Sequence, residues 1–394
     1  MFSKLSNNYD KVCEEFEDMI STEDVLRGIF AMGFEIPVNI QKTMILPFLE
    51  RRDIIVHEKS GTGKTAGFCI PSLEHLMRGG NITKVRKPKV LIISPVRELS
   101  NQTFQVLTSL GKFCDGLKVT ECVGGTSVRD NINALRDGCQ IVCGTPGRIL
   151  DMIGKGFLSP KDLDIIILDE ADDLLKRNFK FSIYEIFEAC SDDVQICLYS
   201  ATMPKEVIEI AENFLRDPVV SLLEEDNLTL DGIQQYYVDC CESQWKLDTL
   251  LDLYSVLNNS KAFIFVNKNE RALELCENLR KRKFTPSVIM GTMMQNERNS
   301  VLREFRDDKT NILISSDLLA RGIDIQGVDL VINYDFPTDR ENYIHRIGRS
   351  GRHGRKGVAI NFITKEDYKL VEEYEKYYHT KINNLPCDVD SLFD

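Results

Sequence analysis

DIIVHEKSGTGKT, at residues 53–65, is the most informative stretch of this chain. Residues 53–56 are apolar enough to form a buried strand, and the glycine-rich loop after them opens a helical pattern. In such a loop the backbone amides wrap a phosphate, the lysine reaches the outer phosphate oxygens, and the final hydroxyl can hold Mg²⁺. The residues in question are Ser60, Gly61, Thr62, Gly63, Lys64 and Thr65. A strand, a phosphate loop and a helix in this order predict an α/β domain with a site for a nucleoside triphosphate.

One residue departs from the usual pattern of this loop. Glu58 occupies the first position of the pattern, where a small residue is usual. Because a carboxylate that pointed at a triphosphate would repel it, we expect the Glu58 side chain to face away or to pair with a cation.

A pair of acids follows the apolar run at residues 165–168. Parallel sheets place their ligand sites at the carboxyl ends of strands, so Asp169 and Glu170 would lie in such a site. Asp169 would hold Mg²⁺ directly or through water, and Glu170 would orient and deprotonate the attacking water. Taken alone, these acids could equally form the first turn of a helix, where negative charge is favourable. The phosphate loop upstream favours the catalytic interpretation.

Short apolar runs alternate with helical patterns along the chain. The expected strands are residues 53–56, 90–94, 140–143, 165–168, 195–199, 261–266, 286–289, 311–315, 330–333 and 358–362. Continuous apolar runs indicate strands buried on both faces, as in a parallel sheet, and helices such as residues 269–281 supply the crossovers. Residues 21–24 predict a capping box. We therefore predict an α/β fold of two tandem doubly wound parallel-sheet domains, residues 14–220 and 233–394, joined by a linker at residues 221–232.

Charge and cysteine usage limit the classes of function. The 394 residues carry a formal net charge of -12, which is the wrong sign for holding nucleic acid by bulk electrostatics. A nucleic-acid surface would therefore have to be a local basic patch. The 12 cysteines are scattered and show no pattern of a disulfide framework or a zinc site. We expect free thiols in a reducing compartment, and a soluble intracellular protein that does not enter membranes.

Taken in order, the motifs resemble those of the DEAD-box RNA helicases, whose name spells residues 169–172. This resemblance implies two RecA-like domains that close around ATP and single-stranded RNA, with ATP and Mg²⁺ as cofactors. Residues 33–41, GFEIPVNIQ, look like the adenine-reading motif of the family. By that match Phe34 would stack on the base and Gln41 would hydrogen-bond its edge. Read alone, Phe34 would be a core aromatic.

Two further motifs are similar to those that complete the family's ATP site. In HRIGRSGR, residues 345–352, Arg349 and Arg352 would reach the γ-phosphate from the second domain. If this segment is helical, a spacing of three residues places both arginines on one face. In DLLARGID, which ends at Asp324, Gly322 and Asp324 would contact the ribose.

The family also implies residues that couple the two domains. Ser200 and Thr202 belong to a match to its SAT motif, whose hydroxyls would tie the acids, including Asp172, to the second domain. His345 would take part from the other side.

The remaining resemblances concern binding of the RNA backbone. The residues that match these motifs are Pro95, Arg97, Gly124, Gly125, Thr145, Arg148, Asn267, Arg298 and Ser316. Arginines of this kind pair with phosphates, whereas glycines and helix starts offer amides. Such contacts reach phosphates and 2′-hydroxyls and no base edge, so binding should be largely independent of sequence. Val96 and Ser316 stand where the family usually has threonine, and we expect altered RNA affinity without loss of activity.

Within the family the chain is similar to initiation factor 4A, for example in WKLDTL at residues 245–250. That branch implies a monomeric cytoplasmic helicase that acts in translation initiation, with an initiation factor 4G-like scaffold as a partner. The alternative is an ATP-locked RNA clamp of the nuclear exon-junction or ribosome-biogenesis type. A motor acting on DNA and a catalytically inactive scaffold are further alternatives. Stimulation of the ATPase by DNA would favour the motor, and Glu58 is the only sign of the scaffold.

Overall fold

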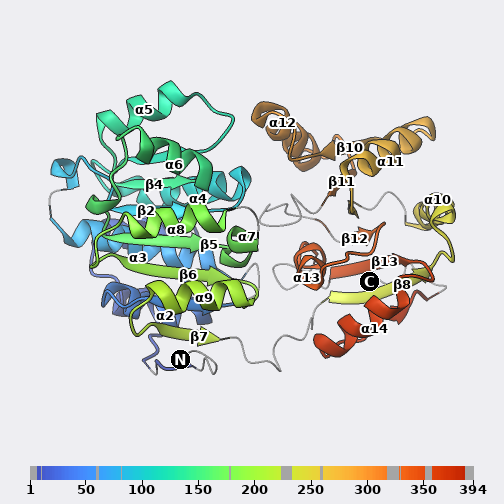
Figure 1. The fold of residues 1–394 in the computed structure, drawn as a ribbon, viewed down its shortest axis with the longest axis horizontal. Helices are drawn as coiled ribbons and strands as arrows, with labels where there is room; N and C mark the ends of the chain where they lie inside the picture. Colours follow the sequence, from blue (N-terminus) through green and yellow to red (C-terminus); the bar gives the residue numbers. More distant parts are fainter. Residues whose placement is uncertain are drawn as a thin grey trace. The chain divides into compact units, whose positions relative to one another are not determined.

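The computed structural model describes residues 7–9, 11–58, 62–80, 82–176, 179–222, 233–257, 261–316, 328, 330–350 and 357–386. The chain divides into two compact units, Met1–Leu223 and Glu224–Asp394 (Figure 1). Each unit has a sheet and hydrophobic cores of its own.

Unit 1 is built on a seven-stranded sheet in the order β3-β4-β2-β5-β6-β1-β7. Its strands are β1 Ile54–His57, β2 Val90–Ile93, β3 Val119–Cys122, β4 Ile141–Gly144, β5 Ile165–Asp169, β6 Gln195–Ser200 and β7 Val219–Leu222. Its helices are α1 Glu23–Ala31, α2 Asn39–Leu49, α3 Lys64–Arg78, α4 Arg97–Leu110, α5 Val128–Asp137, α6 Pro146–Gly154, α7 Ala171–Lys176, α8 Lys180–Glu188 and α9 Lys205–Phe214. Because all the strand pairs are parallel, the carboxyl ends of the strands lie at one edge.

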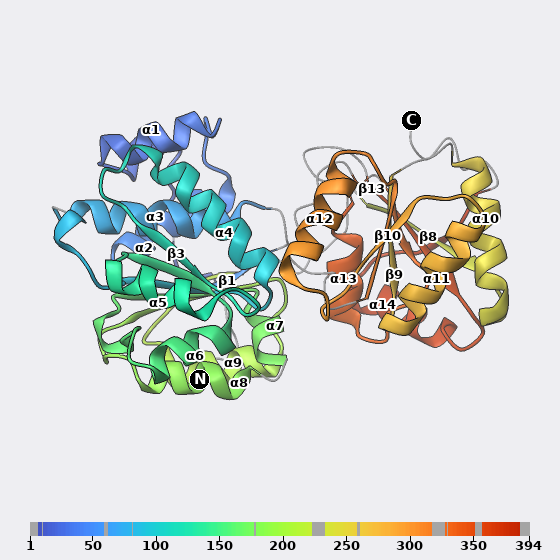
Figure 2. The same ribbon diagram turned by 90° about the horizontal axis from the view of Figure 1, so that it is seen from above.

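Side chains of this sheet alternate between two cores, one on each face. Ile54 and Val56 of β1 pack with helices α1 to α4, whereas Ile55 between them packs with helices α5 to α9 (Figure 2). The central strands β2 and β5 are buried at every residue because helices cover both faces. This double burial is the physical reason for the continuous apolar runs in the sequence.

Unit 2 repeats the plan with a sheet in the order β10-β11-β9-β12-β13-β8-β14. Its strands are β8 Ile233–Asp239, β9 Ala262–Val266, β10 Pro286–Ile289, β11 Ile312–Ser316, β12 Leu330–Asn333, β13 Gly357–Ile363 and β14 Asn383–Asn384. Its helices are α10 Lys246–Val256, α11 Asn269–Lys281, α12 Gln295–Arg306, α13 Arg340–Ile347 and α14 Tyr368–Tyr377. Helices α10 and α11 cover one face, and α12, α13 and α14 cover the other.

The predicted fold class is confirmed, and every expected strand is present with its ends within about one residue of the prediction. Sequence patterns missed β3, β7, β8 and β14, which lie at or next to the sheet edges, where fewer side chains are buried. Ser221 and Leu222, assigned to the linker, are the last residues of β7. The other linker residues, 223–232, lie outside the described part of the chain.

The predicted capping box at residues 21–24 is wrong. Helix α1 begins at Glu23, and the Thr22 side chain makes no capping hydrogen bond. Instead the buried carboxylate of Glu74, on α3, accepts hydrogen bonds from Ser21 N at 2.8 Å, Ser21 Oγ at 2.7 Å and Thr22 N at 3.3 Å. Glu74, which is distant in the sequence, therefore binds the backbone just before α1 in place of a local capping residue.

The cysteines that the structure describes are all free thiols, and most of them are buried. In the part of the chain that the structure describes, no helix is long and apolar enough to cross a membrane.

Candidate functional site

The nucleotide-binding candidates of unit 1 gather at the carboxyl edge of the sheet. Strands β5, β6 and β1 are neighbours, and their register pairs Asp169 with Tyr199 and His57 with Ser200. The phosphate loop therefore begins one strand away from the SAT segment and two strands away from the acids. The order of the strands brings together residues that are far apart in the sequence.

Lys64 is the first residue of α3 and is almost fully buried. Its ammonium donates a hydrogen bond to the backbone oxygen of Glu58 at 2.8 Å, so the lysine folds back onto its own loop. Gly63 has a φ of +96°, and a Cβ at this position would lie 2.7 Å from Val38 Cγ2. The turn therefore requires glycine. The orientation of the Glu58 side chain relative to a nucleotide stays a prediction.

Gln41 joins this loop to the segment before α2. Its side-chain amide donates to Gly63 O at 3.3 Å, and its Oε1 accepts from Val38 N at 3.0 Å. Phe34 packs partly against the core under α1 to α4, as its residue type alone would suggest. Contacts of Phe34 and Gln41 with adenine stay predictions.

Asp169 and Glu170 form a buried pair of carboxylates. Asp169 ends β5, and Glu170 has a φ of +52°, a left-handed conformation that turns the chain into α7. Burial, aided by the charge of Glu170 and opposed by Lys64, raises the pKa of Asp169 to about 7. Negative charge is thus crowded here beyond what Lys64 neutralises, and carboxylate oxygens are the ligands that Mg²⁺ prefers. These residues fit a magnesium ion, which would keep Asp169 ionised.

A closed set of hydrogen bonds ties the last acid to the SAT segment. Thr202 Oγ1 donates to Asp172 Oδ2 at 2.7 Å, and Ser200 Oγ accepts from Asp172 N at 3.2 Å and donates to Thr202 O at 2.6 Å. His57 Nε2, which the sequence analysis did not single out, lies 3.1 Å from Ala201 O. The two hydroxyls thus hold Asp172 within unit 1, and their coupling to the second domain stays a prediction.

The RNA-binding candidates of unit 1 follow β2, β3 and β4, on the other half of the same edge. Pro95 lies in the turn after β2, and Arg97 begins α4. The Arg97 guanidinium packs on the glycine pair: a Cβ on Gly124 would lie 3.5 Å from Arg97 Nη2, and one on Gly125 would collide with Arg97 Nη1. Thr145 Oγ1 accepts from Gly124 N at 3.4 Å. The structure therefore joins motifs from three loops into one surface.

Arg148 is engaged within the unit. Its Nη2 donates to Thr126 O at 3.0 Å and its Nη1 to Thr126 Oγ1 at 3.2 Å, and Nη1 also contacts Asn131 Oδ1. The guanidinium thus holds the loop that follows the glycine pair. Pairing with an RNA phosphate would require these bonds to be shared, and it stays a prediction.

The RNA-binding candidates of unit 2 lie at the carboxyl ends of β9 and β11 and on α12. Ser316 Oγ donates to Asn269 Oδ1 at 2.8 Å, and Asn267 Oδ1 accepts from Arg346 Nη2 at 2.7 Å. Arg298 is nearly buried on α12. This half of the edge therefore corresponds in topology to the RNA half of unit 1.

Asp335, which sequence reasoning missed, organises the loops of unit 2. Its carboxylate lies 3.3 Å from Lys246 Nζ and 3.0 Å from Arg271 Nε, and it accepts a hydrogen bond from Asn267 N at 3.2 Å. Its backbone oxygen accepts from the buried Arg346 Nη1 at 2.7 Å. Buried charges are tolerated when they are saturated in this way. The only signal in the sequence was an acid two residues after the end of a predicted strand.

Helix α13, which opens the arginine-rich segment, ends at Ile347, and Gly348 is its C-cap. Helix α13 thus stops before Arg349, so the condition for a shared helical face is not met at this arginine, and Arg352 lies outside the described part of the chain. Arg349 is nearly buried, and its Nε donates to His345 O at 3.2 Å. Five predicted site residues lie outside the described part of the chain: Ser60, Gly61, Gly322, Asp324 and Arg352.

Both units match known families. Residues 38–210 match the model of the DEAD/DEAH box helicases, and residues 245–354 match the helicase conserved C-terminal domain. ATP-dependent RNA helicase eIF4A of Pyricularia oryzae is 46% identical across 99% of this chain and 97% of its own length. The chain belongs to the DEAD-box helicase family.

This DEAD-box helicase has further similar relatives. Eukaryotic initiation factor 4A of Caenorhabditis elegans is 45% identical over 98% of this chain and 95% of its own. Among solved structures, S. cerevisiae Dbp5 bound to RNA and ADP BeF3 matches with a TM-score of 0.86 at 31% identity, over 96% of this chain and 98% of that one. The predicted resemblance and the enzyme class are confirmed.

Proposed function

We propose that this DEAD-box helicase binds ATP and single-stranded RNA together, hydrolyses the ATP and separates short RNA duplexes. It is an ATP-dependent RNA helicase and therefore an RNA-dependent ATPase. One observation carries the proposal: the adjacent carboxyl ends of β5 and β6 beside β1 bring Lys64, Asp169 and Glu170 to one edge. The similarity to eIF4A and to an RNA-bound and nucleotide-bound Dbp5 supports it.

The N-terminal domain, residues 14–220, would hold the nucleotide. The phosphates would be bound by Ser60, Gly61, Thr62, Gly63, Lys64 and Thr65, and the adenine by Phe34 and Gln41. Gly322 and Asp324 of the C-terminal domain would contact the ribose. Lys64 Nζ would exchange the Glu58 backbone oxygen for the phosphate oxygens. Mg²⁺ held by Thr65 and Asp169 would neutralise phosphate charge. Glu170 would orient the attacking water and take its proton.

The C-terminal domain, residues 233–394, would complete the catalytic site after closing on the linker, residues 221–232. Arg349 and Arg352 would then stabilise charge on the transferred phosphoryl group. His345 would couple closure to Asp172, Ser200 and Thr202, whose hydrogen bonds link Asp172 to the SAT segment.

RNA would lie along the halves of the two sheet edges formed by β2, β3 and β4 and by β9, β10 and β11. The residues that would contact its backbone are Pro95, Arg97, Gly124, Gly125, Thr145, Arg148, Asn267, Arg298 and Ser316. These side chains and amides offer donors for phosphate, so affinity should depend on salt more than on sequence.

The test compares ATP hydrolysis and duplex separation by the wild type and Glu170→Gln, with and without single-stranded RNA. We expect RNA to stimulate the wild type, and the variant to bind ATP normally but to hydrolyse it at least about 10²-fold more slowly, because general base catalysis is worth that much. Equal stimulation by DNA would contradict RNA specificity. Normal hydrolysis by Glu170→Gln would show that another group activates the water.

We further propose that the helicase acts in translation initiation in the cytoplasm, as a monomer that binds an initiation factor 4G-like scaffold. The full-length similarity to eIF4A supports this role. The measurement is RNA-stimulated turnover in the presence of such a scaffold. Turnover that persists or rises supports the proposal, whereas turnover that stops while RNA stays bound would identify the ATP-locked clamp instead.

A further inference from the structure

The edge of the unit 1 sheet at which the strands begin lies opposite the candidate site, and half of it is basic. Residues 82–89, 112–118 and 136–140, which lead into β2, β3 and β4, together contain seven cations and two acids. These three strands are neighbours in the sheet, so the segments reach the same half of this edge. We call the three segments the basic edge. It is a local positive patch on a chain whose formal net charge is -12.

A buried glutamine ties the segments of the basic edge together. Gln140, at the start of β4, is only 3% exposed. Its Oε1 accepts a hydrogen bond from Lys118 N at 2.7 Å, and its Nε2 donates to Ile82 O at 3.3 Å and to Val85 O. The backbone that carries the cations is therefore held in place, so a ligand that binds them loses little entropy in ordering it.

Two of the cations are neutralised by acids from the segment before β5. Lys87 Nζ lies 2.9 Å from Asp162 Oδ2, and Lys89 Nζ lies 3.1 Å from Asp164 Oδ1. These pairs hold the segment before β2 against its neighbour in the sheet. Their charge is less available to a ligand.

The free cations of the basic edge are Lys84, Arg86 and Lys118. All three side chains are exposed, and among the residues that the structure describes none of them has an ion pair. The two acids of the basic edge, Asp115 and Asp137, are exposed as well. Because the cations outnumber the acids, the patch attracts anions.

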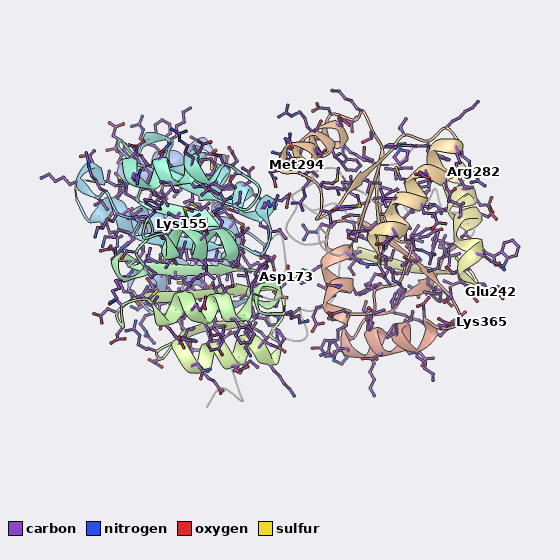
Figure 3. The ribbon with its side chains drawn as sticks, turned by 45° about the horizontal axis from the view of Figure 1, so that its top comes forward. Lys155, Asp173, Glu242, Arg282, Met294 and Lys365 are labelled. Carbon is purple, nitrogen blue, oxygen red and sulfur yellow. The ribbon has the colours of Figure 1, made fainter. Side chains whose placement is uncertain are left out.

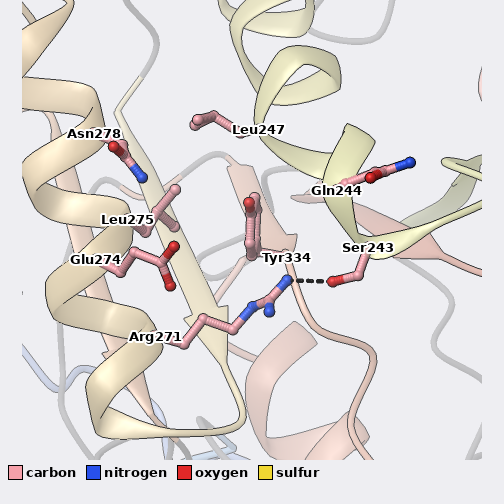
Figure 4. Close-up of a pocket in the computed structure, with 8 residues that line it drawn as sticks. All are labelled: Ser243, Gln244, Leu247, Arg271, Glu274, Leu275, Asn278 and Tyr334. Carbon is pink, nitrogen blue, oxygen red and sulfur yellow. Dashed lines mark hydrogen bonds between the residues drawn. The ribbon is translucent and has the colours of Figure 1, made fainter.

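Two groups of cations on unit 2 are explained by their own surroundings. Arg282 belongs to a basic run, residues 280–283, at the end of α11, where positive charge stabilises the helix (Figure 3). Arg271 lines a pocket beside the same helix (Figure 4). Its Nε lies 3.0 Å from the Asp335 carboxylate, and its Nη2 donates to Ser243 Oγ at 2.7 Å. The arginine of this pocket is thus already paired.

The surroundings of the free cations on unit 1 favour a polyanion over a folded protein partner. In the described part of the chain, none of the large hydrophobic side chains that are exposed belongs to the basic edge. Protein–protein interfaces are anchored by apolar and aromatic side chains, whereas interfaces with nucleic acids are polar and strongly positive. The chemistry of the basic edge therefore matches a phosphodiester backbone.

We propose that the basic edge is a second binding site for single-stranded RNA, separate from the one at the carboxyl edge. Lys84, Arg86 and Lys118 pair with the phosphates of a stretch of RNA outside the catalytic site. Because these contacts involve charge alone, the basic edge does not distinguish RNA from DNA. The site goes beyond the proposed function, since it needs neither ATP nor the catalytic residues.

The first measurement is binding of oligouridines to the full-length protein without nucleotide. A long oligouridine can reach both edges and gains affinity over a short one by avidity. We expect the double variant Lys84→Gln, Arg86→Gln to bind the long oligouridine at least roughly fivefold more weakly at low salt and to lose most of that gain. Unchanged affinity for the long oligouridine would overturn the proposal.

The salt dependence of binding tests whether the lost contacts are to phosphates. Each phosphate contact to a single strand contributes about 0.7 to the slope of log affinity against log salt concentration, so the double variant should lower the slope by about 1.4. Adding Lys118→Gln should lower it by about 0.7 more. The control is Lys369→Gln with Lys376→Gln, an equal charge change at two exposed positions of α14. Equal effects of the control would show that only net charge matters and would overturn the site.

ATP turnover separates the basic edge from the catalytic site. At saturating RNA the double variant should hydrolyse ATP within about twofold of the wild-type rate, whereas the concentration of long oligouridine that gives half of this rate should rise. A lower maximal rate would place the two cations in the catalytic machinery and overturn the proposal. If RNA does not stimulate turnover at all, the proposed function fails, but the binding measurements still test the basic edge.

Competition identifies the class of ligand. Oligodeoxyuridine and polyglutamate of equal charge are added to the wild type bound to the long oligouridine. We expect the DNA to remove the contribution of the basic edge more effectively, because its phosphates have the spacing of those in RNA. If polyglutamate competes better, and only when Lys84 and Arg86 are present, the basic edge belongs to an acidic protein and the proposal is overturned.

Discussion

Gly63 shows how tightly the phosphate loop is packed on the segment that would read adenine. Its φ is +96°, and a side chain there would press on Val38 and Gln41. Gly67, one turn later in α3, is different, because a Cβ would sit 3.8 Å from Gln41 Cγ, an ordinary contact. Alanine substitutions at these two glycines therefore form a matched pair. Both add a methyl group, but only the one at Gly63 disturbs the geometry of the phosphate loop.

We expect Gly63→Ala to weaken ATP binding by roughly tenfold or more, because the left-handed conformation costs an alanine about 1–2 kcal/mol and the methyl group collides with Val38. Gly67→Ala should bind ATP nearly as the wild type does. Titration with a fluorescent ATP analogue measures both. An unchanged affinity for Gly63→Ala would mean that the loop rearranges freely.

At the scale of elements, α1 and α3 are joined by a buried carboxylate. Glu74 is fully buried and binds Ser21, Thr22 and Arg78, whose Nε is 2.6 Å away. Burial alone would raise the pKa of Glu74, but the hydrogen bonds from Ser21, Thr22 and Arg78 outweigh it and lower the pKa below its usual value. A carboxyl group with a lower pKa in the folded state stabilises the fold above its unfolded pKa. That contribution is lost as the pH falls through the folded pKa.

Glu74→Gln should therefore lower the free energy of unfolding by about 1–3 kcal/mol near neutral pH, because it leaves buried donors poorly matched. The difference from the wild type should shrink as the pH falls from the ordinary pKa of a glutamate through the lowered pKa of Glu74, because the wild-type carboxyl group then becomes protonated. Urea unfolding over a pH series measures this. Glu188→Gln, at an exposed position of α8, is the control and should change stability by less than about 0.5 kcal/mol. A constant difference at all pH values would rule out the ionised carboxylate as the cause.

At the scale of the whole molecule, the proposed activity requires both units. The phosphate loop and the acids lie on unit 1, whereas Arg349 lies on unit 2. An arginine supplied to a phosphoryl-transfer site accelerates the reaction without being needed for nucleotide binding. Hydrolysis should thus be more sensitive than binding to a change on unit 2.

Arg349→Ala should bind ATP with nearly normal affinity but lower RNA-stimulated turnover by about 10³–10⁵-fold. Arg340→Ala is the control, because Arg340 is a half-buried arginine of the same unit, at the start of α13. Its guanidinium stacks on Tyr377 at 3.9 Å from the ring centroid. Steady-state ATPase rates compare the two variants. If Arg349→Ala keeps its turnover within about twofold of the wild type, Arg349 of the second unit does not take part in hydrolysis.

The amino-acid sequence alone was sufficient for the fold class, and it also predicts the residue types of the proposed catalytic centre. Apolar runs such as residues 165–168 indicate strands buried on both faces, because every side chain of such a strand contacts a core and has to be apolar. The glycines, lysine and acids of the two main motifs are informative because few residue types can perform their chemistry. The bounds of helix α11 could also be predicted to the residue, because its apolar positions follow the helical period.

Tertiary structure was needed wherever a residue acts through a partner far away in the chain. Glu74 caps residues 21–22 in place of the local box, Asp335 joins Lys246, Arg271 and Asn267, and Arg148 is held by Thr126 and Asn131. Periodicity and motif spacing describe neighbours along the chain and contain no information about which strands become adjacent. The order of the strands in each sheet decides those contacts, and with them the residues that hold the site in place.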